Sequence, residues 1–249
     1  MPKRVLITIE YDGSAYCGWQ RQLNGPSVQQ KIEEALHNLT GEKIVITGAS
    51  RTDAGVHARG QRAHFDIGAK IPPEKLPFAL NTLLPRDIRV TAGAEAPSSF
   101  HARFDAKGKE YSYLIYNRRH PSALLRDRSC HAPLPLDEKA MQRACLHLVG
   151  THDFAAFQAS GGTAKTTLRH IERAEVQRSG DEIRLEIYGT AFLYNMVRII
   201  AGTLVYVGEG RLPEDAFARA IETGDRLRLG PTAPPQGLCL ERVDYGGGL

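Results

Sequence analysis

The sequence has few cysteines, and it lacks the spacings by which cysteine and histidine usually hold metals or form disulfide frameworks. Its four cysteines, Cys17, Cys130, Cys145 and Cys239, stand singly and form no C-x-x-C pair. We therefore expect them to be reduced residues of the core or of loops. The nine histidines form no H-E-x-x-H or Cys/His cluster, so the sequence predicts no metal site.

Long hydrophobic runs are also absent. No apolar stretch approaches the roughly 18 residues of a membrane-spanning helix, so we expect no membrane association. The first residues, MPKRVLITIEYDG, pass from two basic residues directly into an alternation typical of a strand. They lack the apolar core and cleavage site of a signal peptide, and a cytoplasmic protein is therefore expected.

Neither sign of charge is in large excess. The formal net charge is +4 and the pI is about 8.9, and the small excess is divided evenly between the two halves. Any surface for nucleic acid must therefore be a local patch. The densest basic cluster is Arg118, Arg119, His120, Arg126 and Arg128. A solvated loop explains this cluster, and contacts with phosphate explain it equally well.

Strand and helix patterns alternate along the chain, and their order over residues 1–105 returns over residues 106–249. These two ranges are expected to be two α/β halves, each similar to an RNA-recognition domain. The sequence therefore predicts an α+β fold with a largely antiparallel sheet and a central cleft. The expected strands are 5–11, 44–47, 63–67, 88–92, 109–117, 171–177, 182–188 and 238–243; the expected helices are 28–40, 74–84, 138–149, 196–207 and 213–223; residues 152–162 are expected to form a loop.

One carboxylate stands out because it lies in a basic loop. Asp53 lies two residues after Arg51, and Gly48 and Gly55 on either side allow the backbone a positive φ. Arg51 can form a charge-assisted pair with Asp53 and keep the carboxylate ionised. On spacing alone, an Asp in such a loop more commonly forms a turn or a solvated ion pair than acts in catalysis.

Two further residues allow two interpretations each. Trp19, the single tryptophan, is either a loop anchor packed on the core or a direct contact to RNA. Arg198 lies within an apolar helical stripe, where it either snorkels to water or pairs with a carboxylate or phosphate. Asp53 is the candidate partner.

Five strings, taken together, resemble the motifs of the tRNA pseudouridine synthases of the TruA family, in the order of that family. They extend over almost the whole chain. The strings are Y-D-G-x-x-Y-x-G-W-Q from Tyr11, R-T-D-A-G-V-H-A around Asp53, H-A-R-F-D-A-x-x-K-x-Y ending at Tyr111, F-L-Y-N-M-V-R ending at Arg198, and A-P-P-x-G-L-x-L from Ala233.

The resemblance implies a pseudouridine synthase fold and a homodimer that isomerises uridines 38, 39 and 40 in the anticodon arm of tRNA. By position in the motifs, Asp53 is the residue that attacks the substrate. Tyr111 is the ring that stacks on the target uracil, and Arg198 pairs with the catalytic Asp. Arg51, Arg59, Arg103 and Lys109 are, with Tyr111, the expected contacts to the RNA substrate.

The implied reaction breaks the C1′–N1 glycosidic bond and joins C1′ to C5, with no change in oxidation state. No cofactor is therefore expected, and neither G-x-G-x-x-G nor G-x-x-x-x-G-K-[ST] occurs in the chain. Asp53 could attack C6 of the base or C1′ of the sugar. Arg51 could occupy the space that the flipped base vacates, or hold phosphate.

Two other functions are alternatives to the synthase. A non-catalytic RNA-binding protein would use the arginines but would have no need of Asp53. A carboxylate hydrolase usually has a second acid placed for general acid catalysis, and the Asp53 loop offers only basic neighbours.

Overall fold

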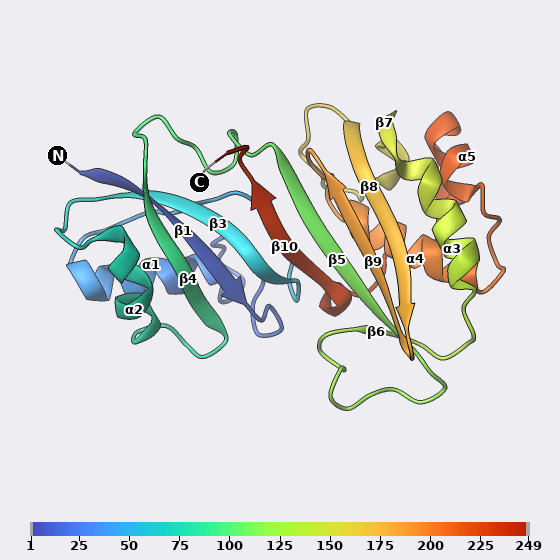
Figure 1. The fold of residues 1–249 in the computed structure, drawn as a ribbon, viewed down its shortest axis with the longest axis horizontal. Coiled ribbons are helices and arrows are strands. Elements are labelled where there is room, and N and C mark those ends of the chain that lie inside the picture. The colour runs from blue at the N-terminus through green and yellow to red at the C-terminus, as the bar shows by residue number, and fades with distance from the viewer. Residues whose placement is uncertain (1, 248–249) are drawn as a thin grey trace. The chain divides into compact units, whose positions relative to one another are not determined.

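A computed structural model of the chain describes residues 2–247, which divide into two units. The first unit contains the described residues up to Lys107 and those from Leu240 onward, and the second unit contains Gly108–Cys239. Both units combine strands with helices (Figure 1). The predicted α+β class is therefore confirmed.

Three long antiparallel strands form the sheet of the first unit. They are β1 (Lys3–Tyr11), β3 (His57–Ile67) and β4 (Ile88–Ala96). β1 pairs with β3 on one side and with β4 on the other. The alternation that predicted β1 reflects burial, because Val5, Ile7 and Ile9 have no exposed surface.

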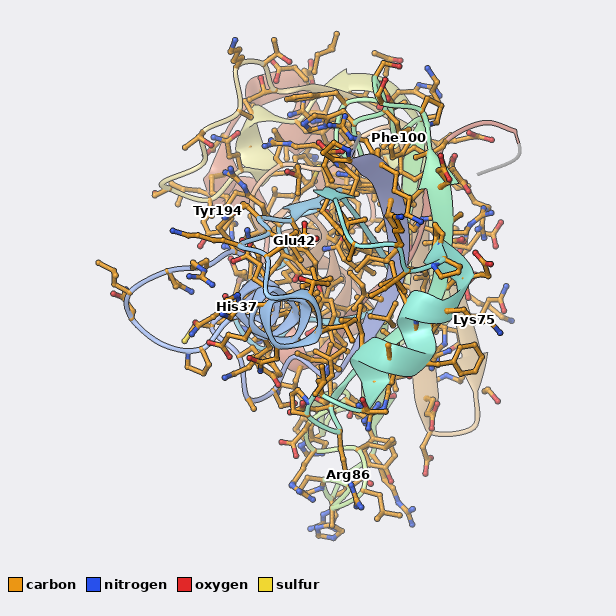
Figure 2. The ribbon with its side chains drawn as sticks, turned by 90° about the vertical axis from the view of Figure 1, so that its left-hand side faces the viewer. His37, Glu42, Lys75, Arg86, Phe100 and Tyr194 are labelled. Carbon is orange, nitrogen blue, oxygen red and sulfur yellow. The ribbon has the colours of Figure 1, made fainter. Side chains whose placement is uncertain are left out.

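The helix α1 (Val28–Thr40) begins and ends as its sequence predicts. Ser27 accepts a hydrogen bond from the backbone N–H of Gln30 at 3.2 Å, which satisfies one of the unpaired donors of the first turn. Gly41 ends the helix at φ 76°, a conformation that glycine adopts without steric cost. At this end (Figure 2), His37 Nδ1 lies 3.2 Å from the carbonyl oxygen of Glu42.

The strand predicted at residues 44–47 is mostly absent, and only β2 (Thr47–Gly48) forms, paired with β3. Side chains of α1 take the backbone groups that a longer strand would use. Glu33 accepts the N–H of Ile46 at 3.1 Å, and the Gln29 amide donates to the carbonyl of Ile46 at 3.1 Å. The extended segment is thus bonded to a helix instead of a sheet.

The helix predicted at 74–84 is shorter than expected. A 3₁₀ turn, η1 (Pro73–Lys75), leads into α2 (Leu76–Asn81). The Asn81 side chain donates to the carbonyl of Val90 and accepts its N–H, both at 2.9 Å. These bonds tie the end of the helix to β4, and residues 82–84 leave the helix.

The second unit contains a mainly antiparallel sheet, as the sequence predicts. Its strands lie in the order β5-β9-β8-β7, with all three pairs antiparallel, and β6 pairs with β5 in parallel. The strands are β5 (Gly108–Asn117), β6 (Cys130–Ala132), β7 (Gly150–Asp153), β8 (Leu168–Ser179) and β9 (Glu182–Gly189).

Helices cover this sheet and complete the core of the second unit. They are α3 (Glu138–Cys145), α4 (Met196–Gly208) and α5 (Ala216–Thr223), and short 3₁₀ turns are η2 (Leu146–Leu148), η3 (Ala155–Phe157), η4 (Arg226–Arg228) and η5 (Pro235–Gly237). Asp137 caps α3 by accepting the N–H groups of Lys139 and Ala140. Met196, Ile199 and Leu204 of α4 are fully buried, as their helical spacing predicts.

Two expectations for the second unit are wrong. The third helix ends at Cys145 and tightens into η2, which buries Leu148 and leaves Val149 41% exposed. The predicted loop 152–162 includes part of β7 and all of η3. Phe157 is fully buried and stacks on Phe217, with the ring centroids 5.8 Å apart. Apolar packing therefore orders this segment.

The last strand, β10 (Leu238–Asp244), enters the first unit at Leu240. There, a Cβ on Gly60 would lie 2.3 Å from the carbonyl oxygen of Glu241, so the close approach of β3 and β10 requires glycine. Tyr245 donates its hydroxyl to the carbonyl of Ala102 at 2.7 Å. Within residues 2–247, no helix combines the length and apolarity needed to cross a membrane.

Candidate active site

The loop that carries Asp53 is held by backbone hydrogen bonds to a distant part of the first unit. The Trp19 N–H donates to the Thr52 carbonyl at 3.0 Å, and the Gly55 N–H donates to the Tyr16 carbonyl at 3.3 Å. Within the loop, the Val56 N–H donates to the Asp53 carbonyl at 3.2 Å. The backbone on both sides of Asp53 is therefore restrained.

The end of β1 and the residues just after it add further restraints. The hydroxyls of Tyr11 and Thr52 are 2.7 Å apart, and the Gly13 N–H donates to His57 Nδ1 at 3.1 Å. Asp12 Oδ1 approaches the same nitrogen at 3.3 Å. A backbone N–H can only donate, so Nδ1 is an acceptor and its approach to Asp12 is not an ion pair.

Glycines allow this segment to lie directly against the Asp53 loop. A Cβ on Gly13 would lie 2.0 Å from the Val56 carbonyl oxygen, and one on Gly18 would lie 2.6 Å from that of Thr52. Gly18 also has φ +98°, which disfavours any other residue. Trp19 is 1% exposed and contacts Gly48, so it is the packed loop anchor and not a surface for RNA.

Asp53 itself is half-buried, whereas Arg51 is exposed. Among residues 2–247, no hydrogen bond or ion pair involves Arg51. The expected Arg51–Asp53 pair is therefore wrong. Arg59 is 68% exposed and lies 3.7 Å from the Glu241 carboxylate, a distance too long for a strong pair.

Arg103 lies beside a short stack of aromatic rings in the first unit. Its guanidinium is 6.0 Å from the centre of the Phe104 ring, and Phe104, 75% exposed, stacks on His101 at 4.2 Å. His101 Nδ1 accepts the N–H groups of Arg103 and Phe104. The His64 ring packs against His101, with the ring centroids 4.9 Å apart. Burial, together with the nearby His101, lowers the pKa of His64.

In the second unit, β5 presents Lys109, Tyr111 and Tyr113 at alternate positions. Tyr111 is 7% exposed, and its ring and that of Phe192 pack nearly at right angles, with the centroids 5.1 Å apart. Tyr113 is fully buried and donates to the carbonyl of Pro234 at 2.7 Å. Burial raises the pKa of Tyr113, so it is a neutral core residue.

Arg198 of α4 is half-buried, and its guanidinium is held by two neutral acceptors of the second unit. Nε donates to the Ala233 carbonyl at 2.8 Å, and Nη1 donates to Asn195 Oδ1 at 2.8 Å. The Ala233 N–H in turn donates to the Arg198 carbonyl at 3.0 Å. Snorkelling into water does not describe this side chain.

The predicted residues thus divide between the two units: Asp53, Arg51, Arg59 and Arg103 belong to the first, and Lys109, Tyr111 and Arg198 to the second. Sequence reasoning missed Asn195 and Phe192, which contact Arg198 and Tyr111. Both residues stand in the F-L-Y-N-M-V-R string. An Asn immediately before a helix was the available signal for a special backbone conformation.

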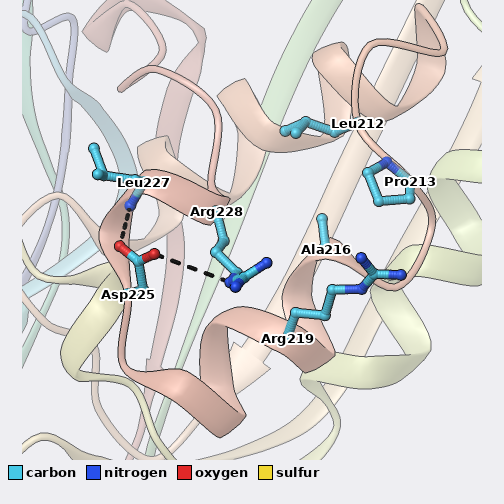
Figure 3. Close-up of a pocket in the computed structure, with 7 residues that line it drawn as sticks. All are labelled: Leu212, Pro213, Ala216, Arg219, Asp225, Leu227 and Arg228. Carbon is cyan, nitrogen blue, oxygen red and sulfur yellow. Dashed lines mark hydrogen bonds and ion pairs between the residues drawn. The ribbon is translucent and has the colours of Figure 1, made fainter.

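A cavity of about 410 Å³ in the second unit contains none of these residues (Figure 3). Asp225 accepts the N–H of Leu227 at 2.9 Å there and lies 3.9 Å from Arg228. The cavity is lined by Leu212, Pro213, Ala216, Arg219, Asp225, Leu227 and Arg228. It gives no support to the candidate site. The described residues also include no group of three or more His, Cys, Asp or Glu that could hold a metal ion.

Comparison with known proteins identifies the family. A family model described as tRNA pseudouridine synthase matches residues 7–105 and 144–246. The chain belongs to the tRNA pseudouridine synthase family. The enzyme is therefore an isomerase that converts uridine to pseudouridine in tRNA, with the fold of that family.

Relatives of this synthase match it from end to end. Proteins named tRNA pseudouridine synthase A from Ruminiclostridium cellulolyticum and Acetivibrio thermocellus are 51% and 50% identical to it. One from a Thermoanaerobacter species is 46% identical, and each of the three alignments covers 98% of this chain and 100% of the relative. A chain of a solved Cbf5-Nop10-Gar1 complex aligns with TM-score 0.42 and 14% identity, over 95% of this chain and 48% of that one. The family assignment does not rest on this weaker likeness.

Proposed function

We propose that this synthase isomerises uridines 38, 39 and 40 in the anticodon stem-loop of tRNA, with Asp53 as the nucleophile and without a cofactor. The observation that carries the proposal is the Asp53 loop, a half-buried carboxylate in the R-T-D-A-G-V-H-A string. Hydrogen bonds with Trp19 and Tyr11 and the contact with Gly18 fix this loop. A restrained nucleophile favours reaction because its orientation is set before the substrate binds.

The chemistry needs the carboxylate at one particular step. The C1′–N1 bond of uridine breaks, the uracil rotates, C1′ joins C5, the C5 proton is lost and N1 takes up a proton, so that the product is an isomer of the substrate. Asp53 would form a covalent bond with C6 of the base or with C1′ of the sugar while the uracil turns, and that bond would break again before the product leaves. Both routes are redox-neutral and need only protein side chains, which is why no cofactor is proposed.

Tyr111 and Arg198 supply the two other catalytic functions in this proposal. Tyr111 would stack on the flipped uracil, and Phe192 packed against its ring holds it in place. It could also assist the later loss of the C5 proton. Arg198, with an ordered guanidinium, would keep Asp53 ionised.

The remaining basic residues would bind the RNA. Arg51 is exposed and makes no bond with any other described residue, which leaves it available for phosphate or for the space that the flipped base vacates. Arg59, Arg103 and Lys109 would contact the backbone. We further propose a cytoplasmic homodimer; action on tRNA supports the location, and the family resemblance supports the dimer.

Position-specific substrates test the proposal. Anticodon-arm RNAs with a single uridine at 38, 39 or 40 would be incubated with the enzyme, digested to nucleosides and analysed for pseudouridine. All three should be converted, and the same arm with cytidine at these positions should not. Pseudouridine found only elsewhere in full-length tRNA would keep the enzyme class and overturn the proposed positions.

A further inference from the structure

Asn195 has an unusual backbone conformation. Within the described part of the chain it is the only non-glycine residue with positive φ, at φ 61° and ψ 6°. The left-handed region costs most L-residues roughly 1 kcal/mol or more, and Asn tolerates it best among them. Such strain often marks a residue whose side chain is needed in one particular direction.

The side chain of Asn195 does not do what its position predicts. Asn at the N-cap of a helix usually accepts an N–H of the first turn, yet Asn195 makes no such bond at the start of α4. Its Oδ1 instead accepts a hydrogen bond from Arg198 Nη1 at 2.8 Å. The left-handed backbone therefore serves Arg198 and not the helix end.

The second acceptor of the guanidinium is equally well fixed. Arg198 Nε donates to the carbonyl of Ala233, and the segment before Ala233 lies tightly against α4. A Cβ on Gly202 would be 1.9 Å from the Pro231 carbonyl oxygen, and the Gly230 N–H donates to Thr203 Oγ1 at 3.0 Å. Two rigid acceptors, bound through different nitrogens, define both the position and the plane of the guanidinium.

We propose that Asn195 is a positioning residue for the isomerisation, because its carboxamide oxygen fixes the orientation in which Arg198 acts. The inference rests on the proposed function, in which Arg198 keeps the nucleophile ionised. Without the Asn195 bond, Nη1 would lose the acceptor that, together with the Ala233 carbonyl on Nε, sets the plane of the guanidinium. Fewer molecules would then hold Arg198 in the reactive orientation, so the loss falls on kcat and not on tRNA binding.

The substitution Asn195→Gly separates the side chain from the backbone. Glycine adopts the left-handed conformation without strain, so the fold keeps its turn and only the carboxamide is lost. We expect kcat to fall by roughly 10- to 100-fold, with KM within about twofold and the melting temperature within about 2 °C of the parent. Asn195→Asp, which keeps an acceptor oxygen, should recover part of the lost kcat.

A merely structural role gives the opposite pattern. Asn195→Gly would then be as active as the parent, and Asn195→Ala would lose stability and activity together because alanine must adopt the strained conformation. Parental kcat in Asn195→Gly, or no recovery in Asn195→Asp, overturns the inference. If Asn195→Gly does not fold, the comparison of Asn195→Asp with Asn195→Ala decides by the same criterion.

Arg198→Ala, alone and combined with Asn195→Gly, distinguishes the two levels of the proposal. If Asn195 acts through Arg198, the double variant should be no slower than Arg198→Ala; an additive further loss overturns the inference. A parent that forms no pseudouridine overturns the proposed function. An Arg198→Ala variant with parental kcat overturns the role of Arg198, and the inference with it.

Discussion

Two arginine-rich loops of this synthase are built in opposite ways. The loop of Asp53 is bonded to residues about 30 or 40 positions earlier in the chain: Tyr11 and Trp19 both bind Thr52. Within the loop of residues 118–129, several bonds join residues only a few positions apart. Arg126 Nη1 donates to the Ala123 carbonyl, and Ser129 Oγ donates to that of Leu125, each at 2.8 Å.

The difference agrees with the roles proposed for the two loops. A nucleophile must be placed to within a fraction of an ångström, and long-range bonds and close glycine contacts fix the backbone around Asp53. Arginines that attract phosphate work through charge, and long flexible side chains serve that purpose. The exposed ion pairs Arg118–Asp181 at 3.4 Å and Arg126–Asp127 at 3.0 Å stabilise such a loop little.

Of the changes that keep a carboxylate at position 53, a conservative change at Asp53 itself should have the largest effect. Asp53→Glu keeps the charge but moves the carboxylate by one methylene, and we expect kcat to fall by about 10³-fold. The matched change in the other loop, Arg119→Lys, also keeps the charge and should alter kcat less than twofold. Single-turnover formation of pseudouridine measures both. Equal losses of kcat at the two positions would contradict the proposal that only the Asp53 loop needs exact placement.

The glycine contacts should come next in size. Gly18→Ala places a Cβ 2.6 Å from the Thr52 carbonyl oxygen, so the Asp53 loop must shift, and kcat should drop by roughly 100-fold. Gly161→Ala is the control, since Gly161 also has positive φ, +89°, but nothing lies within 4 Å of its added Cβ. It should lose some stability and no activity. A Gly18→Ala enzyme with parental kcat would show that the loop tolerates displacement.

A smaller effect is expected from removing one charge of the 118–129 loop. Arg119 is exposed, and Arg119→Ala should weaken tRNA binding a few-fold and reduce the slope of log affinity against log salt by about 1. Exposed Arg86 (Figure 2) provides a control variant, Arg86→Ala, with no change expected. Filter binding over a salt series distinguishes them, and an unchanged slope for Arg119→Ala would leave the loop as a solvated surface.

The smallest catalytic effect should come from the cap of α1. Ser27→Ala removes the hydrogen bond to Gln30 and should cost about 1 kcal/mol of unfolding free energy. Because α1 stabilises the unit without positioning Asp53 directly, kcat per folded molecule should stay within about twofold. Denaturant unfolding and a titrated activity assay check both values. A large loss of kcat would mean that general stability, and not local contacts, positions the nucleophile.

Features that depend on near neighbours could be read from the sequence. The alternation of Val5, Ile7 and Ile9 predicted β1, and Ser27 with Gly41 predicted both ends of α1, because strand faces and helix caps involve residues only a few positions apart. Within the site, the motif strings led to Asp53 and Arg198, and both are half-buried.

Features that depend on distant partners could not be read in this way. The strand predicted at 44–46 does not form because Gln29 and Glu33, more than ten positions earlier, bind the backbone of Ile46. Arg51 was expected to bind Asp53 from its spacing, but tertiary contacts set the direction of the loop. The Ala233 carbonyl that accepts a hydrogen bond from Arg198 likewise lies 35 positions later in the chain.

The role of Asp53 as nucleophile is best tested by tritium release from tRNA labelled at C5 of uridine, measured for the parent and for Asp53→Asn at equal occupancy of bound tRNA. We expect release by the parent. We expect a loss of about 10⁴-fold or more in Asp53→Asn with binding retained. Comparable release by both proteins would contradict the assignment of Asp53 as the nucleophile.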